Sequence, residues 1–413
     1  MDALNRNLQT RIKQLSANFP IIVILGVRQC GKSTLAKSVG RDWKYYDLEN
    51  QNHLERIKSD PVLFFRENNQ HVIIDEAQTY PQLFATLRGV VDERRDINGR
   101  FILTGSASFE LMKNVSESLA GRVAVIELEP MKMNELKKEP LSDFFSIFEK
   151  KLSRDDLTDI KKLKSLRTLK DVNHYLLKGG YPQPVLQENR DFFLDWMENY
   201  FSTYINRDMR NLFPRIDILK YQRVIKMLSS ISGTIVNKSE LARSAESNEK
   251  SIRDYLQIIS GTFFWRELPA YKTSKIKTTT SLPKGHFRDS GLLLFLQNIF
   301  TQEELEFYPK LGNVFESFVV EELIRGVQAV AARNVKTYHF RTKAGGEIDL
   351  ILEGSFGLLP IEIKYQSNTS KRQLTSMTNF IKLHQLPYGV VVNNCDSPSL
   401  ITENIIQVPI AAL

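Results

Sequence analysis

The sequence predicts an α/β protein of several domains: a parallel α/β domain, a helical and winged-helix middle, and a second α/β domain. Apolar, β-rich runs alternate with helical segments over residues 1–130, as in a parallel sheet covered by helices. A helical region at 131–215 and a helix-turn-helix pattern at 216–290 follow, and alternation returns at 291–413. The length of 413 residues agrees with this division, because domains hold about 150 residues on average.

The composition is that of an ordinary globular protein. Hydrophobic residues make up 42% and charged residues 25%, which excludes collagen-like and wholly disordered chains. Apolar runs such as 21–25 and 291–296 fall far short of the roughly 20 residues of a membrane-spanning helix. We therefore expect a cytoplasmic protein that does not contact a membrane. The excess of 56 Lys and Arg over 48 Asp and Glu gives a net charge of +8, which suits an anionic partner without requiring one.

A phosphate-binding loop follows the first apolar run. The segment GVRQCGKST has the spacing G-x4-G-K-S and leads into a helical segment. Its glycines let the backbone approach phosphate, and its amides point there from a helix N-terminus. The lysine supplies a point charge, and the serine hydroxyl can bind Mg²⁺. The residues expected to bind ATP here are Gly26, Arg28, Gln29, Cys30, Gly31, Lys32, Ser33 and Thr34.

The apolar run from His71 to Ile74 ends in two carboxylates. Asp75 can reach the Mg²⁺ shell together with Ser33, and Glu76 can polarise the attacking water. A pair of acids can also simply close a strand, but the phosphate-binding loop favours the Walker B interpretation. The sequence thus predicts ATP hydrolysis with Mg²⁺, in which Lys32 and Glu76 are catalytic.

Further apolar runs at 43–48, 100–103 and 123–128 bring the expected sheet to five parallel strands. The polar end of the 100–103 strand carries Thr104 and Ser106, which can sense the γ-phosphate or cap the next helix. Arg122 precedes the last strand. It is a candidate for contacting phosphate in its own or a neighbouring subunit, with a solvated arginine as the alternative.

From residue 218 the pattern of three helices, a strand and a Lys/Thr-rich loop outlines a winged helix. The positions that would contact DNA are Asn248, Lys250 and Arg253 at the start of the recognition helix, with Lys272, Lys275 and Lys277 on the wing. Winged helices also serve as packing or regulatory modules, so DNA contact is one of two interpretations.

Residues 310–365 carry a second set of carboxylates. Glu316 projects from a helical segment, and period-two alternation puts Glu347 with Asp349, and Glu362 with Lys364, on one face of two successive strands. An aspartate followed by E-x-K on the next strand is the core of a PD-(D/E)xK nuclease site. In that interpretation Glu316, Asp349 and Glu362 hold Mg²⁺ and Lys364 steadies the attacking water. A charged stripe on a solvated sheet face is the alternative.

The order GVRQCGKST, VIIDEAQ, ILTGS, GGYP, FRDSGLLLFL, GNVFESFVVEEL and PIEIKY resembles a large prokaryotic family of predicted ATPases. That family joins an AAA-type domain (AAA_14) to a C-terminal domain of unknown function (DUF4143). The resemblance implies an ASCE-type P-loop ATPase domain and a restriction-endonuclease-like C-terminal domain. It supports Lys32, Ser33, Asp75 and Glu76 for ATP, and the four residues Glu316, Asp349, Glu362 and Lys364 for the nuclease-like site.

The leading hypothesis is an ATPase whose nucleotide state controls a C-terminal, nuclease-like module directed at duplex or branched DNA. The rival is an ATP-dependent switch that binds a protein partner and whose nuclease-like domain is catalytically silent. Other copies of this chain are a further possible partner. If Arg122 contacts the nucleotide of a neighbouring subunit, a ring-shaped homo-oligomer is favoured.

Overall fold

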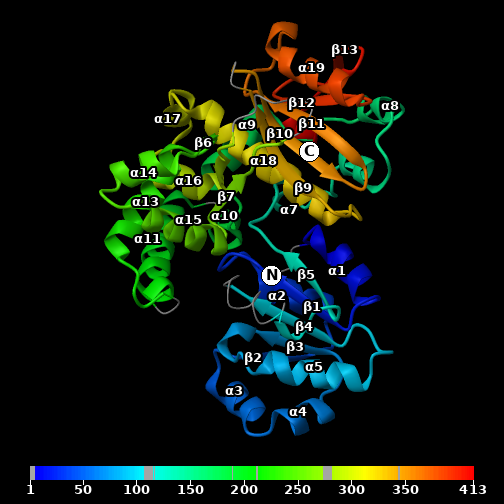
Figure 1. The fold of residues 1–413 in the computed structure, drawn as a ribbon, viewed down its shortest axis with the longest axis vertical. Helices are drawn as coiled ribbons and strands as arrows, with labels where there is room; N and C mark the ends of the chain where they lie inside the picture. Colours follow the sequence, from blue (N-terminus) through cyan, green and yellow to red (C-terminus); the bar gives the residue numbers. More distant parts are fainter. Residues whose placement is uncertain are drawn as a thin grey trace. The chain divides into compact units, whose positions relative to one another are not determined.

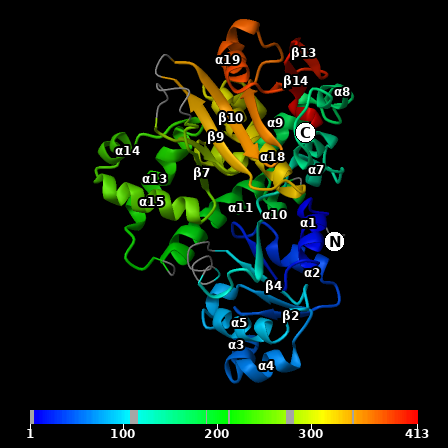
Figure 2. The same ribbon diagram turned by 45° about the vertical axis from the view of Figure 1, so that its right-hand side comes forward.

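The protein is described from a computed structural model, shown in two views in Figures 1 and 2. The structure describes residues 5–106, 115, 117–187, 189–210, 213–272, 281–342 and 345–413. The chain forms two compact units. The first holds the residues up to Met131 together with Gly261–Phe263, and the second holds Lys132–Ser260 and Phe264–Leu413.

A five-stranded parallel sheet forms the centre of the first unit, in the order β2-β3-β4-β1-β5 (Figure 1). Its strands are β1 (Ile21–Leu25), β2 (Lys44–Asp47), β3 (Val72–Asp75), β4 (Phe101–Gly105) and β5 (Val123–Glu127). Every residue of β1, β3 and β4 is buried, because these strands have neighbours on both sides. The five parallel strands expected from the sequence are confirmed.

Helices flank this sheet along the chain. They are α1 (Leu8–Ser16), α2 (Lys32–Val39), α3 (Gln51–Lys58), α4 (Pro61–Glu67) and α5 (Leu83–Glu93). Side-chain caps begin two of them, since Asn50 and Asp60 accept backbone N–H groups at the first turns of α3 and α4. The helix α2 begins directly at the phosphate-binding loop.

The second unit begins with a helical region that agrees with the pattern of the sequence. It contains α7 (Met133–Leu136), α8 (Asp156–Ile160), α9 (Leu169–Lys178), α10 (Pro182–Leu186) and α11 (Arg190–Thr203). A π-helical turn, Tyr204–Met209, continues α11. The GGYP segment after α9 is held by Asp289, whose carboxylate accepts the Gly180 N–H at 2.8 Å and also caps α16 (Ser290–Leu296).

Between these helices and the last sheet lies a compact α/β segment. Its elements are α13 (Ile218–Ser230), β6 (Thr234–Ile235), α14 (Lys238–Ser244), α15 (Glu249–Gly261), β7 (Trp265–Leu268) and β8 (Lys284–Phe287). The three strands form an antiparallel sheet in the order β6-β8-β7, so β8 is central. Helix α17 (Gln302–Glu306) then leads to the C-terminal part.

The C-terminal sheet is mixed and has six strands in the order β13-β14-β12-β11-β10-β9. The strands are β9 (Lys336–Arg341), β10 (Glu347–Gly354), β11 (Gly357–Ile363), β12 (Gly389–Asn393), β13 (Ser399–Thr402) and β14 (Ile405–Pro409). Two helices belong to this part, α18 (Leu311–Ala329) and α19 (Thr375–His384). The strand β13 has no counterpart in the sequence analysis, because its residues are largely exposed and lack an apolar alternation.

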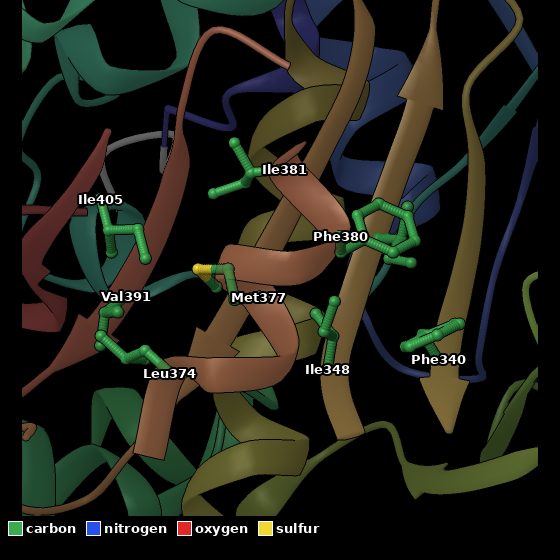
Figure 3. Close-up of a cluster of buried hydrophobic side chains, with 9 residues drawn as sticks. Phe340, Ile348, Leu374, Met377, Phe380, Ile381, Val391 and Ile405 are labelled. Carbon is green, nitrogen blue, oxygen red and sulfur yellow. The ribbon is translucent and has the colours of Figure 1, made fainter. Parts of the chain in front are cut away.

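A cluster of buried apolar side chains joins α19 to this sheet (Figure 3). Met377 and Phe380 of α19 pack with Ile348 of β10 and Val391 of β12. Because side chains alternate along a strand, Ile348 on this face places the neighbouring Glu347 and Asp349 on the opposite face. The core therefore determines which side of the sheet carries the carboxylates. No helix among the described residues is long and apolar enough to cross a membrane.

Candidate functional site

The phosphate-binding loop has the backbone that close approach to phosphate requires. Gly31 has φ +98° at the start of α2, and Gln29 also has a positive φ of 63°. At Gly26 the φ is +156°, and a Cβ there would clash with the carbonyl oxygen of Leu128. The Lys32 side chain is buried, and its Nζ donates to the carbonyls of Gly26 at 3.2 Å and Val27 at 3.0 Å.

The order of the strands brings the second half of the nucleotide site to the same edge as this loop. Because β1, β3 and β4 are parallel, their carboxyl ends meet at one edge of the sheet. Asp75 is the last residue of β3, and Thr104 is the last but one of β4. Asp75 is buried, and its carboxylate accepts hydrogen bonds from Thr104 Oγ1 and from the Tyr45 hydroxyl, the latter at 2.5 Å. Burial and then the hydrogen bond to Asp75 raise the pKa of Tyr45.

Glu76 is held in a left-handed backbone conformation, with φ 52°. Its N–H donates to Thr104 Oγ1 at 3.3 Å, and its Oε2 accepts from Ser106 Oγ at 3.0 Å and from the amide of Gln78. Thr104 and Ser106 thus bond to the two Walker B carboxylates. Whether they also sense the γ-phosphate stays a prediction, and the helix they were expected to cap falls in 107–114, outside the described residues.

The N-terminal segment forms hydrogen bonds to the phosphate-binding loop. Arg6 donates to the Cys30 carbonyl at 2.8 Å and to the Glu129 carbonyl at 2.7 Å. The Cys30 thiol is buried and donates to the Leu128 carbonyl at 3.3 Å, and burial raises its pKa. A raised pKa lowers the thiolate fraction, so this thiol is a packing group in the loop. Arg28 is more exposed and forms an ion pair of 3.4 Å with Glu49.

Arg122 lies at the amino end of the parallel strands, opposite to the end that carries the phosphate-binding loop. It precedes β5, which runs parallel to β1 with Val123 opposite Ile21, so a strand length of about 15 Å separates it from the loop. Its guanidinium donates to both oxygens of Asp92, at 2.7 and 2.8 Å. Contact with phosphate in its own subunit does not agree with this position. Contact in a neighbouring subunit stays a prediction.

In the second unit, the four residues expected at the C-terminal site lie close together, and two of them, Glu316 and Asp349, contact a residue that was not expected. The Nζ of Lys284, from β8, donates to Glu347 at 2.8 Å and to Asp349 at 3.0 Å. It also forms an ion pair of 2.6 Å with Glu316 of α18. On the other side of Asp349, the Lys364 ammonium lies 3.4 Å from its carboxylate and 2.7 Å from Glu362.

Burial and neighbouring charges shift the pKa values of the carboxyls in this cluster in different directions. Burial raises the pKa of Glu316 to about 8, and burial together with Asp349 raises that of Glu362 to about 8. Burial alone would also raise the pKa of Asp349, but the Lys284 and Lys364 ammonium groups lower it to about 2. The carboxylates raise the pKa of Lys284 well above its usual value despite burial, so it stays charged.

The cluster is not arranged as a metal site. Among the described residues, no group of three or more His, Cys, Asp and Glu has an arrangement that could hold a metal ion. Divalent cations require several oxygen ligands at about 2.0–2.6 Å from one point, whereas the carboxylates here surround an ammonium. Glu362 Oε2 and His286 Nε2 are buried without a hydrogen-bond partner in the described structure. The expected ligands Glu316, Asp349 and Glu362 therefore do not suit Mg²⁺ as they stand.

The residues expected to contact DNA are exposed where the structure describes them. Lys250 and Arg253 lie in the first turns of α15, and Asn248 caps this helix by accepting the Ser251 N–H at 2.8 Å. Arg253 pairs with Glu249 at 3.6 Å. Lys272 is exposed, and Lys275 and Lys277 lie outside the described residues.

Comparison with protein-family models matches three parts of the chain. Residues 18–137 match an AAA domain (AAA_14), residues 169–303 a domain of unknown function (DUF8612), and residues 311–413 another (DUF4143). Uncharacterized proteins of Mycobacterium tuberculosis and Mycobacterium bovis are each 30% identical over 88% of this chain and 75% of their own length. The chain belongs to this family of AAA-domain P-loop ATPases that end in DUF4143.

Two further similarities of this ATPase are more distant. An uncharacterized protein of Methanocaldococcus jannaschii is 24% identical over 86% of the chain and 76% of its own length. The solved structure of a Walker-type ATPase of Pyrococcus abyssi is 15% identical, covers 72% of this chain and 96% of its own, and has a TM-score of 0.46.

Several residues that shape the two sites of this ATPase escaped the sequence analysis. Tyr45 and Gln78 bond to the Walker B carboxylates from a neighbouring strand and from the next turn; no motif marks Tyr45, and Gln78 ends the VIIDEAQ motif but was given no role. Lys284 lies 32 residues before Glu316 in the sequence, in a segment interpreted as part of the winged helix. The Lys-Gly-His alternation at 284–286 puts two polar side chains on one face of β8, which was the available indication.

Protonated carboxyls in the C-terminal cluster predict a specific pH dependence of stability. A carboxyl whose pKa rises from 4.5 to about 8 on folding stabilises the native state fully below 4.5, and this contribution is lost as pH rises to about 8. The free energy of unfolding should therefore fall over this window by about 1 kcal/mol per pH unit for each such group. Urea unfolding of Glu362→Gln should show a shallower fall, and Glu306→Gln, at an exposed position, the wild-type slope. Identical slopes in both variants would contradict the assignment.

Proposed function

We propose that this chain binds and hydrolyses ATP with Mg²⁺, and that its nucleotide state controls the C-terminal module. The single observation that carries this proposal is the meeting of the phosphate-binding loop with Asp75 and Glu76 at one edge of the sheet. The AAA-domain match over residues 18–137 supports it. The residues present suit a nucleotide, because the loop conformation, the buried lysine and the two carboxylates are each what its phosphates and metal require.

Each residue takes a defined part in this proposal. The loop amides and the Lys32 ammonium hold the β- and γ-phosphates, and on nucleotide binding Lys32 exchanges its bonds to the Gly26 and Val27 carbonyls for phosphate oxygens. Ser33 and Asp75 hold Mg²⁺, which neutralises phosphate charge when it is bound. Glu76 accepts the proton of the attacking water. Its carboxylate is free for this once the hydrogen bonds from Ser106 and Gln78 open.

Two substitutions separate binding from turnover. Lys32→Ala should abolish ATP binding, because it removes the one ammonium that the loop presents. Glu76→Gln should keep ATP binding and lower turnover by about 100-fold or more, since general-base catalysis contributes that much. Binding of a fluorescent ATP analogue and release of inorganic phosphate measure the two effects.

Matched controls come from the same domain. Lys13→Ala and Glu93→Gln change exposed residues of α1 and α5 and should leave both measurements unchanged. Normal turnover in Glu76→Gln would remove this carboxylate from the role of base. Undiminished ATP binding by Lys32→Ala would contradict the nucleotide site itself.

For the C-terminal module we propose DNA as the first candidate target, with a nuclease-like fold. The order α18-β9-β10-β11-α19-β12 and the carboxylates of β10 and β11 support the kinship with restriction endonucleases. The winged-helix order of α13, α14, α15 and the β6-β8-β7 sheet supports contact with DNA. The net charge of +8 is consistent with a polyanionic partner.

DNA binding through α15 predicts a salt-dependent loss in two variants. Lys250→Ala and Arg253→Ala should weaken binding of duplex or branched DNA, and each should reduce the salt dependence of log K by about 1. Fluorescence anisotropy at several salt concentrations measures both. Lys382→Ala, an exposed lysine on α19, is the control. Equal affinities of all three variants for DNA would contradict this interface.

A groove in the helical region favours a second candidate function, a switch that binds a protein partner. The groove has a volume of about 710 Å³ and lies between α7, α9, α10 and α11. Leu136, Leu177 and Leu194 are among its apolar lining residues. Its described basic residues, against the single acid Asp171, are Lys137, Arg167, Lys170, Lys178 and Arg190.

The charges of this groove indicate an acidic occupant with apolar side chains. Lys178 is half-buried over the Phe193 ring, 4.4 Å from its centre, and burial followed by Arg190 lowers its pKa. No described acid forms an ion pair with Lys178, whereas Arg190 attracts Glu304. A nucleic acid would fill the aliphatic floor poorly, because it offers phosphates and flat bases. An acidic peptide segment of a partner protein supplies both carboxylates and apolar groups.

A copolymer of glutamate and tyrosine is a suitable probe for this groove. It should bind more tightly than polyglutamate, and the double variant Lys178→Glu/Arg190→Glu should lose about tenfold or more in affinity, because each reversal places like charges together. Lys371→Glu/Lys382→Glu, on exposed residues of the C-terminal part, should keep the affinity. Equal losses in both double variants would show a non-specific effect of net charge and contradict the groove.

A further inference from the structure

The ammonium of Lys284 lies at the centre of the C-terminal carboxylates. Three carboxylate oxygens, from Glu316, Glu347 and Asp349, are within 3.0 Å of its Nζ. These carboxylates come from two different elements, α18 and β10, and the lysine from a third, β8. Two of these contacts are hydrogen bonds, to Glu347 and Asp349, and the contact with Glu316 is an ion pair.

The side chain is buried and its backbone is fixed. Only 4% of the Lys284 side chain is exposed. The residue lies in the central strand of the small antiparallel sheet, where it is opposite Leu268 of β7 and Ile235 of β6. His286, two residues further along the same face, bonds through Nδ1 to Ser317 of α18 at 3.1 Å. The lysine therefore cannot leave the carboxylates by a simple rotation into solvent.

A count of charges shows why a cation is needed at this place. Four carboxyls, Glu316, Glu347, Asp349 and Glu362, face the Lys284 and Lys364 ammonium groups and, at Glu347, the Arg341 guanidinium. Lys364 contacts Asp349 and Glu362, and Arg341 lies 3.6 Å from Glu347, so Lys284 is the one of these three cations that contacts Glu316. An unpaired buried carboxylate is strongly destabilising, because an ion has been moved out of water. Without Lys284 this part of the fold requires another cation or the uptake of protons.

We propose that Lys284 is the resident cation of this cluster, in the place where a divalent metal would otherwise bind. The wild-type cluster then takes up no metal, and a divalent cation binds only when the lysine is absent or β8 moves away from β10 and α18. Lys284 also ties the small sheet of the winged-helix segment to β10 and α18. The position of Lys284 does not depend on ATP hydrolysis. The proposal for Lys284 can therefore be wrong while the ATPase function is right, and the ATPase function can be wrong while this proposal is right.

The test uses the full chain without nucleotide and Mn²⁺ as the probe. Lys284→Met should have a lower melting temperature than the wild type, and saturating Mn²⁺ should raise it again by about 5 °C. The wild type should show no such rise. Loss of the free Mn²⁺ signal in electron paramagnetic resonance counts the bound ions. It should show one more ion in Lys284→Met than in the wild type, and none extra in Lys284→Met/Asp349→Asn.

Lys132→Met is the matched control. Lys132 is also a buried lysine of this unit, with 2% of its side chain exposed, but it pairs with one carboxylate, Glu322, at 3.0 Å. This variant should be destabilised without any Mn²⁺-dependent recovery. If Lys284→Met does not fold, Lys284→Met/Glu347→Gln removes one charge of each sign and keeps Glu316, Asp349 and Glu362 for the same measurement.

Two results would overturn the proposal. One is Mn²⁺ binding by the wild type that Asp349→Asn abolishes, since the metal would then coexist with the lysine. The other is absence of Mn²⁺ binding in both folded Lys284 variants, which would show that the carboxylates cannot hold a cation other than the lysine. Loss of phosphate release in Glu76→Gln has no bearing on either result.

Discussion

The parallel arrangement of β1, β3 and β4 is the constraint on which the nucleotide site depends. The register pairs Val23 with Leu103 and Ile74 with Leu103, so the three strands end at nearly the same level. The loop that begins at Gly26 and the carboxylates that begin at Asp75 are far apart in the sequence, and this register alone brings them together. The wholly buried apolar strands stabilise the register, because a slip would expose them. The same arrangement places Arg122 at the amino end of the strands, away from this loop.

A different kind of interaction organises the second unit. Buried ions occur there in pairs, as Lys132 with Glu322 and as Lys284 with Glu316 and Asp349. Each pair joins segments that are distant in the chain, and breaking one leaves an uncompensated charge in the interior. In the case of Lys284 the pairing connects the small sheet to the C-terminal sheet.

The sequence predicted the parts of the fold whose determinants are local. Uninterrupted apolar runs marked β1, β3 and β4, and the spacing of Gly26, Gly31 and Lys32 marked the loop. The pairing of Glu362 with Lys364 followed from period-two alternation, and the structure places both beside Asp349. The central position of Lys284 could not be predicted, because it depends on how β8 packs against α18 and β10. The partner of Arg122 was missed for the same reason, since Asp92 lies 30 residues away on another element.

We propose that the first unit hydrolyses ATP at its own active site. A single-turnover experiment tests it most directly: the protein, in excess over ATP labelled on the γ-phosphate, is mixed with Mg²⁺ and quenched at intervals. We expect complete conversion of the bound ATP to ADP and labelled inorganic phosphate, and recovery of intact ATP when Mg²⁺ is replaced by a chelator. Intact ATP in the presence of Mg²⁺, from protein shown to bind it, would contradict ATP hydrolysis by this unit.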